Sequence, residues 1–199
     1  TRAKVATNLL RDYGYFNGSV SFQEVPQKNP KESKVSYIIN MAQPYFLDSI
    51  AYLKFPHYAD SLIQSTLSQS VLKGGENFSV LKLEEERQRL SGLFRNHGYY
   101  YYRPEFTTYR ADTLQKPGYV NLQVVPRSGI PAEAKKQYYI GKTSVYLTGY
   151  NDEAPTDTLR LRTMDIYYSG KKPGIRPSAL MRNFFFRKGE LFSQDRQTF

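Results

Sequence analysis

The chain repeats a short pattern, and this repetition limits the folds that it can adopt. The sequence LLRDYGYF at residues 9–16 returns as LFRNHGYY at residues 93–100. Two more pairs follow in the same order: YFLD at 45–48 with YYIG at 138–141, and GENFS at 75–79 with GELFS at 189–193. Such a recurrence indicates one structural module used more than once. The offset between copies grows along the chain, which places insertions in surface loops.

The middle copy is complete and begins with a predicted strand and helix. The strand is expected from Tyr45 to Phe55, because Pro44 and Pro56 bound this apolar segment. Asp60 can cap a first helix that carries apolar residues on one face. Lys73-Gly74-Gly75 is expected to end it, since glycine readily adopts the left-handed conformation of a helix stop.

A second helix is predicted to start at Ser79 and to end at Gly98, as the first copy ends its helix at Gly14. Its apolar stripe comprises Leu83, Leu90, Leu93, Phe94 and His97. Residues 84–89 are charged or polar and are assigned to the remaining, solvated faces, Glu84-Glu85-Glu86 among them.

Two strands follow, from Tyr101 to Arg110 and from Tyr119 to Val125. Val120, Leu122 and Val124 alternate with polar residues, which is typical of a half-buried strand. The matching positions of the first copy are Val35, Tyr37 and Ile39. The module is therefore α+β, strand-helix-helix-strand-strand, with a helix pair packed on a small three-stranded mixed sheet.

Pro104 lies in the predicted strand from Tyr101 to Arg110 and places it at a sheet edge, because proline donates no ladder hydrogen bond. Pro26 stands near the matching strand, Ser19 to Val25. Edge strands can accept an extended peptide as an added strand. The candidate peptide-binding residues are Tyr101, Tyr102, Arg103, Glu105, Thr107, Thr108, Tyr109, Ser19, Ser21 and Gln23.

Composition excludes several kinds of site. The 199 residues contain no cysteine, which rules out disulfides and thiolate metal ligands. The two histidines are His57 and His97, and Tyr13 takes the place of His97 in the first copy, so a packing or capping role is favoured over catalysis. Gly74-Gly75 lacks the following lysine of a phosphate loop. We expect no enzymatic activity, cofactor or metal.

In its order of motifs the chain resembles tandem POTRA (polypeptide-transport-associated) domains of BamA/TamA-like outer-membrane assembly proteins, the surface antigen family. The motifs are Tyr139-Ile140-Gly141, the Gly-Glu-x-Phe-Ser helix start and Leu-Phe-x-x-x-Gly-Tyr at 93–99. Asp48 replaces the usual first-strand glycine, and an insertion near 149–176, where an extra hairpin is expected, departs from the pattern. The expected modules are 44–131 (complete), 1–43 (the C-terminal part of a first) and 132–199 (the N-terminal part of a third).

The resemblance implies a periplasmic arm tethered to the bacterial outer membrane through a C-terminal barrel of the same parent. Such an arm is expected to bind unfolded outer-membrane proteins and accessory assembly subunits, partly by strand addition. The charge of +10 also suits lipid headgroups. The alternative is a basic nucleic-acid-binding module, which the tyrosines and Arg103 after His97 suggest by their stacking potential, although no nucleic-acid partner is expected. The sequence leaves open BamA-like versus TamA-like roles, the number of modules and the oligomeric state.

Overall fold

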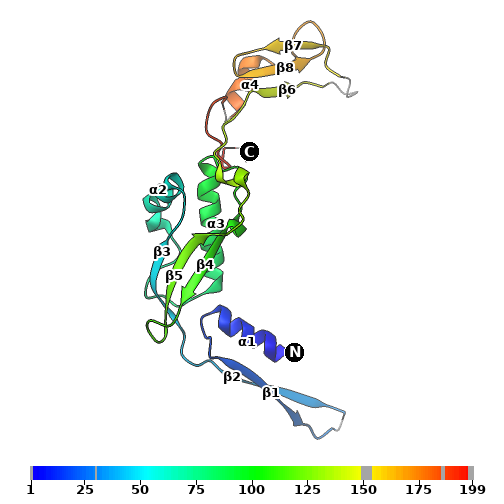
Figure 1. Ribbon diagram of the computed structural model, residues 1–199. Helices are drawn as coiled ribbons and strands as arrows, with labels where there is room; N and C mark the ends of the chain where they lie inside the picture. The colour runs from blue at the N-terminus through cyan, green and yellow to red at the C-terminus, as the bar shows by residue number, and fades with distance from the viewer. Residues whose placement is uncertain (1, 30, 149–153, 185–186, 197–199) are drawn as a thin grey trace. The chain divides into compact units, whose positions relative to one another are not determined.

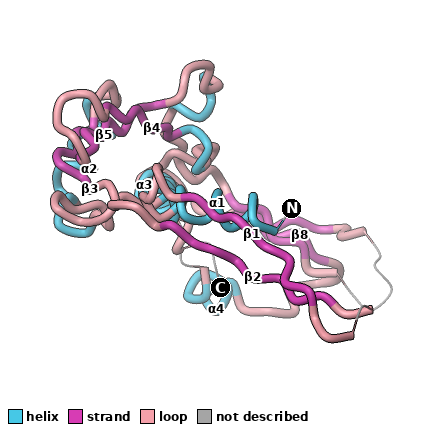
Figure 2. The backbone as a smooth tube through the Cα atoms, turned by 90° about the horizontal axis from the view of Figure 1, so that it is seen from below, coloured by secondary structure: helices cyan, strands magenta, loops and turns pink. Residues whose placement is uncertain are grey.

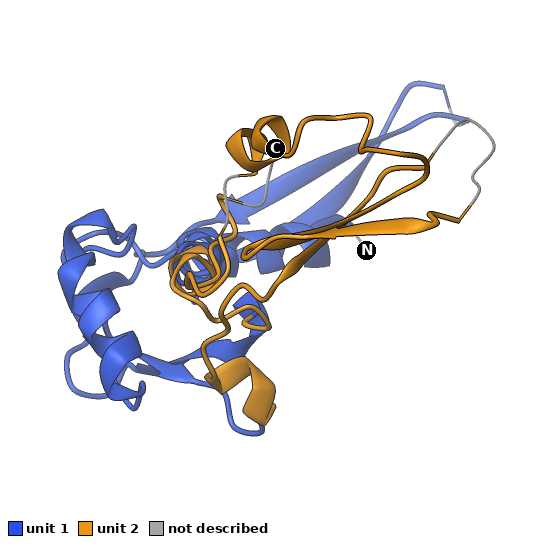
Figure 3. Cartoon of the chain, turned by 90° about the horizontal axis from the view of Figure 1, so that it is seen from above, with its two compact units in different colours: residues 1–91, 103–130 blue, residues 92–102, 131–199 orange. Residues whose placement is uncertain are grey.

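The computed structural model describes residues 2–29, 31–148, 154–184 and 187–196. The chain divides into two compact units, residues 1–91 with 103–130 and residues 92–102 with 131–199 (Figure 3). The division at residue 130 lies beside the predicted end of the middle module, whereas the predicted boundary at 43–44 falls inside unit 1.

Unit 1 opens with a helix and a hairpin. Helix α1 (Arg2–Asp12) precedes strands β1 (Ser19–Pro26) and β2 (Ser33–Asn40), which pair antiparallel as a two-stranded ribbon (Figure 2). Gly14 follows the helix with φ 88°, the left-handed conformation that the sequence predicts for a helix stop.

The rest of unit 1 holds the sheet of the middle module. The elements of this module are β3 (Phe46–Tyr52), α2 (His57–Ser65), the 3₁₀ turn η1 (Leu67–Gln69), α3 (Val80–Asn96), the 3₁₀ turn η2 (Pro104–Phe106), β4 (Thr107–Asp112) and β5 (Tyr119–Pro126). Residues 92–96, at the end of α3, are counted with unit 2. The strand order is β3-β5-β4, with β3 parallel and β4 antiparallel to β5 (Figure 1). The predicted α+β fold, a helix pair on a three-stranded mixed sheet, is confirmed.

The core lies on the helix side of the sheet. Val120, Leu122 and Val124 of β5 are at most 1% exposed, as their alternation predicts. Leu47 on β3 and Ile63 on α2 are buried with them. Gly98 follows α3 with φ 96°, so the predicted end of this helix is also confirmed.

Two local predictions for α2 are wrong. The helix begins after Pro56, which stands at its N-cap, and no side chain caps it; Asp60 lies one turn inside. The helix ends at Ser65 rather than at Lys73-Gly74-Gly75, because the chain tightens into η1 and then leaves the helix at Ser70. Gly75 nevertheless adopts φ 82°. Strand β3 is also shorter than predicted, ending at Tyr52.

In the first copy, the expectation of a half-buried last strand is wrong. Val35, Tyr37 and Ile39 of β2 are 44%, 46% and 58% exposed. Their counterparts on β5 lie on the helix side of a three-stranded sheet, whereas β2 pairs only with β1 among the described residues.

Unit 2 contains a second three-stranded mixed sheet. Its elements are the 3₁₀ turn η3 (Ala132–Lys135), strands β6 (Thr143–Tyr146), β7 (Asp157–Arg160) and β8 (Met164–Tyr168), and helix α4 (Pro177–Asn183). The order β6-β8-β7 has β6 parallel and β7 antiparallel to β8. The expected extra hairpin is therefore present as β7–β8. The sequence also predicts a helix from Ser178 to Phe186, and the last two residues of that range lie outside the described residues.

Candidate functional site

Strand β4 is an edge strand, but it is shorter than the sequence predicts. It begins at Thr107, and Pro104 occupies the first position of η2 rather than a strand. The fixed φ of proline suits the start of such a turn. Tyr101, Tyr102, Arg103 and Glu105 thus lie outside the sheet, and their assignment to an edge strand is wrong.

Two of the candidate residues are core residues. Tyr102 is 7% exposed, and its ring packs edge-on against Phe94 with centroids 4.7 Å apart. Thr107 is 1% exposed. Neither side chain can contribute the exposed surface that a bound peptide would contact. Residue type alone does not predict this, because tyrosines and threonines occur on both faces of strands.

Tyr109 is held against α3. Its hydroxyl donates a 2.6 Å hydrogen bond to the carbonyl of Leu83, and the guanidinium of Arg87 lies 5.4 Å from the ring centroid. Burial, followed by the charge of Glu86, raises the pKa of the Tyr109 hydroxyl above its ordinary value. Tyr109 therefore anchors β4 to the helix, and Thr108 is half-buried beside it.

The outward-facing backbone of β4 can be assigned from its ladder. Arg127 N–H donates to the carbonyl of Phe106 at 2.8 Å, which makes this a hydrogen-bonded pair. Pairs alternate in antiparallel ladders, so the backbone groups of Thr108 and Arg110 also face β5. Those of Tyr109 and Ala111 point toward the outer edge, where an added strand would pair.

The same reasoning applies to β1. Val20 N–H donates to the hydroxyl of Thr7 on α1 at 3.1 Å, so Val20 faces away from β2. By alternation, the backbones of Ser19, Ser21 and Gln23 face β2. These three candidates offer only side chains to a ligand at this edge, and the outer edge is partly occupied by Thr7.

The predicted solvated face of α3 is wrong at Glu86, which is fully buried. Its carboxylate accepts hydrogen bonds from Tyr52 Oη (2.6 Å), Val71 N–H (3.1 Å) and Arg89, whose Nη2 and Nε lie 2.6 and 2.9 Å away. Arg89 also donates to Thr66 Oγ1 at 3.2 Å. Each carboxylate oxygen has two donors, so the network ties β3, the segment after α2 and α3 together.

A repeated junction accounts for the motifs with which the sequence opens. In unit 1, Tyr45 N–H donates to Gly14 O (2.9 Å) and Phe78 N–H to Tyr45 O (2.8 Å). In unit 2, Tyr138 N–H donates to Gly98 O (2.8 Å) and Phe192 N–H to Tyr138 O (2.9 Å). Two further bonds recur in the same way, Leu47 with Glu76 and Gly75, and Ile140 with Glu190 and Gly189.

Aromatic rings close both junctions. Phe16 lies 5.0 Å from Tyr45 and 5.1 Å from Phe78, measured between ring centroids. Tyr100 holds the same place in unit 2, 6.4 Å from Tyr138 and 4.8 Å from Phe192. The repeated sequence blocks are therefore structural contacts and not reactive groups.

The histidine at the end of α3 has a structural environment. His97 Nδ1–H donates to the carbonyl of Leu93 at 2.7 Å, and the amide of Gln137 donates to the carbonyl of His97 at 2.9 Å. Within the described residues, no group of three or more potential ligands could hold a metal ion. No helix in this part of the chain is long and apolar enough to cross a membrane.

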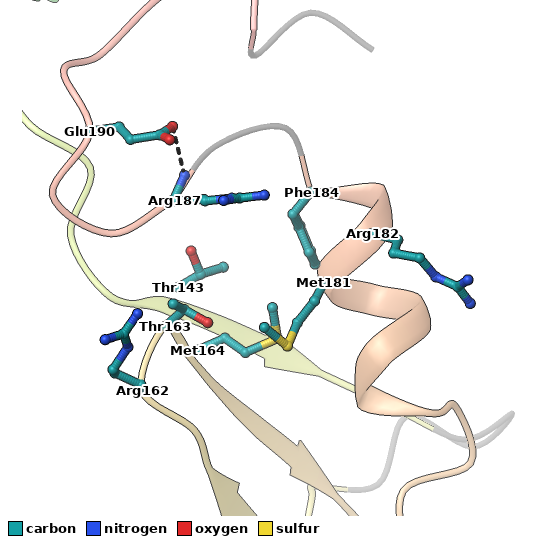
Figure 4. Close-up of a pocket in the computed structure, with 9 residues that line it drawn as sticks. All are labelled: Thr143, Arg162, Thr163, Met164, Met181, Arg182, Phe184, Arg187 and Glu190. Atoms are coloured by element: carbon teal, nitrogen blue, oxygen red, sulfur yellow. Dashed lines mark hydrogen bonds between the residues drawn. The ribbon is translucent and has the colours of Figure 1, made fainter.

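Unit 2 has a hollow of about 670 Å³ beside α4 (Figure 4). Its lining residues are Thr143, Arg162, Thr163, Met164, Met181, Arg182, Phe184, Arg187 and Glu190. Met164 and Met181 lie side by side, while the side chain of Arg182 points away from them. Glu190 accepts a 3.2 Å hydrogen bond from Arg187 N–H. The hollow combines cationic and apolar surface.

Comparisons with known proteins point to one group of solved structures. No family model and no curated protein matches. POTRA3-5 of Haemophilus influenzae BamA is 10% identical, with a TM-score of 0.46 over 98% of this chain and 65% of that one. Haemophilus ducreyi BamA lacking POTRA domains 1-3 is 14% identical, with a TM-score of 0.42 over 63% of this chain and 22% of that one.

The N-terminal domain of Omp85 from Thermosynechococcus elongatus is 14% identical, with a TM-score of 0.31 over 98% of this chain and 66% of that one. The chain thus spans less than two thirds of each of these structures. Its own sheet is mixed and has β4 at an edge, as the sequence predicts, and the structure adds that β3 runs parallel to β5. The strand-helix-helix-strand-strand module of the chain is the fold that its resemblance to POTRA domains implies.

Proposed function

We propose that the chain is part of a periplasmic, non-enzymatic arm of an outer-membrane barrel assembly or translocation protein. It binds unfolded client polypeptides, partly by adding them as strands to its sheets. The observation that carries this proposal is the outer edge of β4, where the backbones of Tyr109 and Ala111 face outward. Backbone hydrogen bonds at such an edge give affinity that tolerates many client sequences.

The proposed binding is weak, because ordering an unfolded client costs much of the interaction free energy. Weak binding suits an arm that must pass its client onward. The exposed rings of Tyr100 and Tyr101, whose centroids lie 4.8 Å apart, supply a second contact of low sequence selectivity in unit 2.

The proposed partners include accessory assembly subunits and a membrane barrel in the same parent, which tethers the arm to the bacterial outer membrane. The proposed modules remain 1–43, 44–131 and 132–199, and the repeated junctions near residues 45 and 138 support this division. Anionic lipid headgroups are a further proposed partner, supported by Arg162, Arg182 and Arg187 around the hollow of unit 2.

A proline substitution tests the β4 edge. Ala111→Pro removes an outward N–H while sparing the ladder to β5, so the variant should fold and lose client binding at β4. Ala111→Ser keeps the N–H and should bind as the unchanged chain does. Binding of a fluorescent peptide from an outer-membrane barrel strand is measured by anisotropy, with circular dichroism to verify folding. Equal binding by both folded variants would contradict strand addition at β4.

A further inference from the structure

One kind of tripeptide recurs in the chain: an aspartate, then a serine or threonine, then a leucine or isoleucine. Its four copies are Asp48-Ser49-Ile50, Asp60-Ser61-Leu62, Asp112-Thr113-Leu114 and Asp157-Thr158-Leu159. The 199 residues include 8 aspartates, 28 serines and threonines, and 26 leucines and isoleucines. From these counts fewer than one such tripeptide is expected by chance, so the recurrence requires a cause.

The fold does not supply this cause, because the four copies share no conformation. In chain order they lie in β3 at a register shift, within helix α2, at the end of β4 with the loop that follows, and in the edge strand β7. Duplication of the module is not the cause either, since three of the copies lie within the single repeat 44–131. A sequence that recurs without a shared structure indicates recognition of the sequence itself.

The hydroxyl-bearing residues of all four copies are exposed. They are Ser49, Ser61, Thr113 and Thr158. The buried serines and threonines in the described part of the chain, Ser70, Ser91 and Thr107, do not follow an aspartate. An enzyme that modifies a side chain must reach it, so the four hydroxyls meet the first requirement of a modification site.

Thr113 is the hydroxyl residue with the fewest structural constraints. It lies in the loop between β4 and β5. The Ser49 hydroxyl instead donates to Asn121 Oδ1 at 2.6 Å, and the Ser61 hydroxyl donates to the carbonyl of His57 at 3.0 Å. The fourth hydroxyl residue belongs to a strand. Loops are the segments in which modifying enzymes most easily reach a side chain.

The neighbours of Thr113 differ in how far the fold explains them. The Asp112 carboxylate accepts hydrogen bonds from Leu114 N–H at 2.9 Å and from Gln115 Nε2 at 2.8 Å, so the aspartate holds the loop. Leu114, in contrast, is 93% exposed and contributes no core contact. A glycan on Thr113 would lie beside this leucine and shield it, because glycans are bulky and solubilising.

The charge at the four sites favours a glycan over a phosphate. A phosphate would place about two negative charges directly beside the preceding aspartate at every site, and such like-charge repulsion is unfavourable. A neutral sugar carries no such cost. Attachment of sugars is also typical of exposed surface segments.

We propose that these four hydroxyls are O-glycosylation sites, with Thr113 the principal one, and that a glycosyltransferase recognises the tripeptide. The donor is a sugar esterified to phosphate at its anomeric carbon. Thr113 Oγ1 forms a bond to that carbon while the bond from the carbon to the phosphate oxygen breaks. The phosphate leaves with the electron pair, and the hydroxyl proton passes to a base of the transferase. Glycosylation goes beyond the proposed function and does not depend on client binding.

The parent protein, isolated from the cells that make it, provides the test. Fragmentation mass spectrometry that keeps side-chain groups attached locates any sugar. The predicted result is a sugar on Thr113 and on the other three hydroxyls, and none on Thr156, an exposed threonine that follows a proline instead of an aspartate. An unmodified Thr113, a phosphate in place of the sugar, or sugars confined to the Asn-x-Ser sequences at Asn17 and Asn77 would overturn the inference.

Variants of the loop separate recognition of the tripeptide from simple exposure. Thr113→Ser keeps the hydroxyl and should retain the sugar, whereas Thr113→Val should lose it. Asp112→Ala should lose the sugar on Thr113 and keep the sugar on Thr158. Circular dichroism verifies that the variants fold. Full glycosylation of Thr113 in Asp112→Ala would show that the tripeptide is not the recognition signal, which contradicts the proposal.

The outcome for client binding is measured separately. Peptide binding at β4 is followed on the chain without sugars, so its failure would contradict the proposed function and leave the glycosylation sites standing. A parent protein without sugars would contradict the glycosylation sites and leave strand addition untouched.

Discussion

The hydroxyl of Tyr52 donates a 2.6 Å hydrogen bond to the carboxylate of Glu86, a residue with no exposed surface. Tyr52 lies at the end of β3 and Glu86 almost two turns into α3, so this bond joins the sheet to its covering helix. The remaining donors to the carboxylate are Arg89 and the backbone of Val71. A buried charge with all its donors in place specifies one arrangement of these elements.

Replacing Glu86 should destabilise the chain strongly. Glu86→Gln removes the charge that pairs with Arg89 and puts an amide donor against other donors. Breaking a buried pair of this kind costs about 3 kcal/mol or more in the free energy of unfolding. Glu85→Gln, at an exposed neighbour, should change it by less than about 0.5 kcal/mol. Urea unfolding measures both, and equal effects would contradict the buried network.

The network predicts an alkaline loss of stability. Burial, followed by the hydrogen bond to Glu86, raises the pKa of Tyr52 from 10.0 to about 12. The unfolded chain therefore loses this proton at lower pH than the folded chain, and stability falls as the pH rises from 10 toward 12. Tyr52→Phe should make this fall less steep. The urea midpoint measured across this range tests the slope, and an unchanged slope would exclude Tyr52 as its source.

The junction of unit 1 requires a glycine for two reasons. Gly14 has φ 88°, and a Cβ there would lie 2.7 Å from the carbonyl oxygen of Phe78. Gly118 has φ 76° but open space around it. Gly118→Ala should cost about 1 kcal/mol, the penalty of the backbone conformation alone. Gly14→Ala should cost more than about 2 kcal/mol, since the Phe78–Tyr45 contact must also shift. Thermal unfolding of both variants measures the difference. Equal melting temperatures would show that the junction accommodates a Cβ at residue 14 without an additional cost.

Local patterns predicted those parts of the fold whose causes are local. Gly14 and Gly98 end their helices because only glycine adopts their conformation readily. The alternation in β5 predicted which of its residues are buried, since one face of that strand meets the helices. The repeat predicted the module as a whole.

Local sequence patterns did not predict contacts between residues that lie far apart in the chain. Glu86 sits in a run of three glutamates that is typical of a solvated helix face, and its donors come from residues 52, 71 and 89. The same pattern of alternation is buried in β5 and exposed in β2, because burial depends on what covers the face of the sheet and not on the strand itself. Pro104 led to the correct edge strand by an argument that the structure does not bear out. The proline starts the turn that precedes β4 and does not lie in the strand.

Strand addition is tested most directly by titrating the chain with an unfolded outer-membrane strand peptide while backbone amide shifts are recorded at low and high salt. An oligonucleotide of matched charge magnitude serves as the comparison. Shifts at Tyr109 and Ala111, and along β1–β2, that persist at high salt are the predicted result, because ladder hydrogen bonds are not screened as surface charges are. Shifts that arise only with the oligonucleotide and vanish in salt would contradict strand addition and assign the basic surface to nucleic acid.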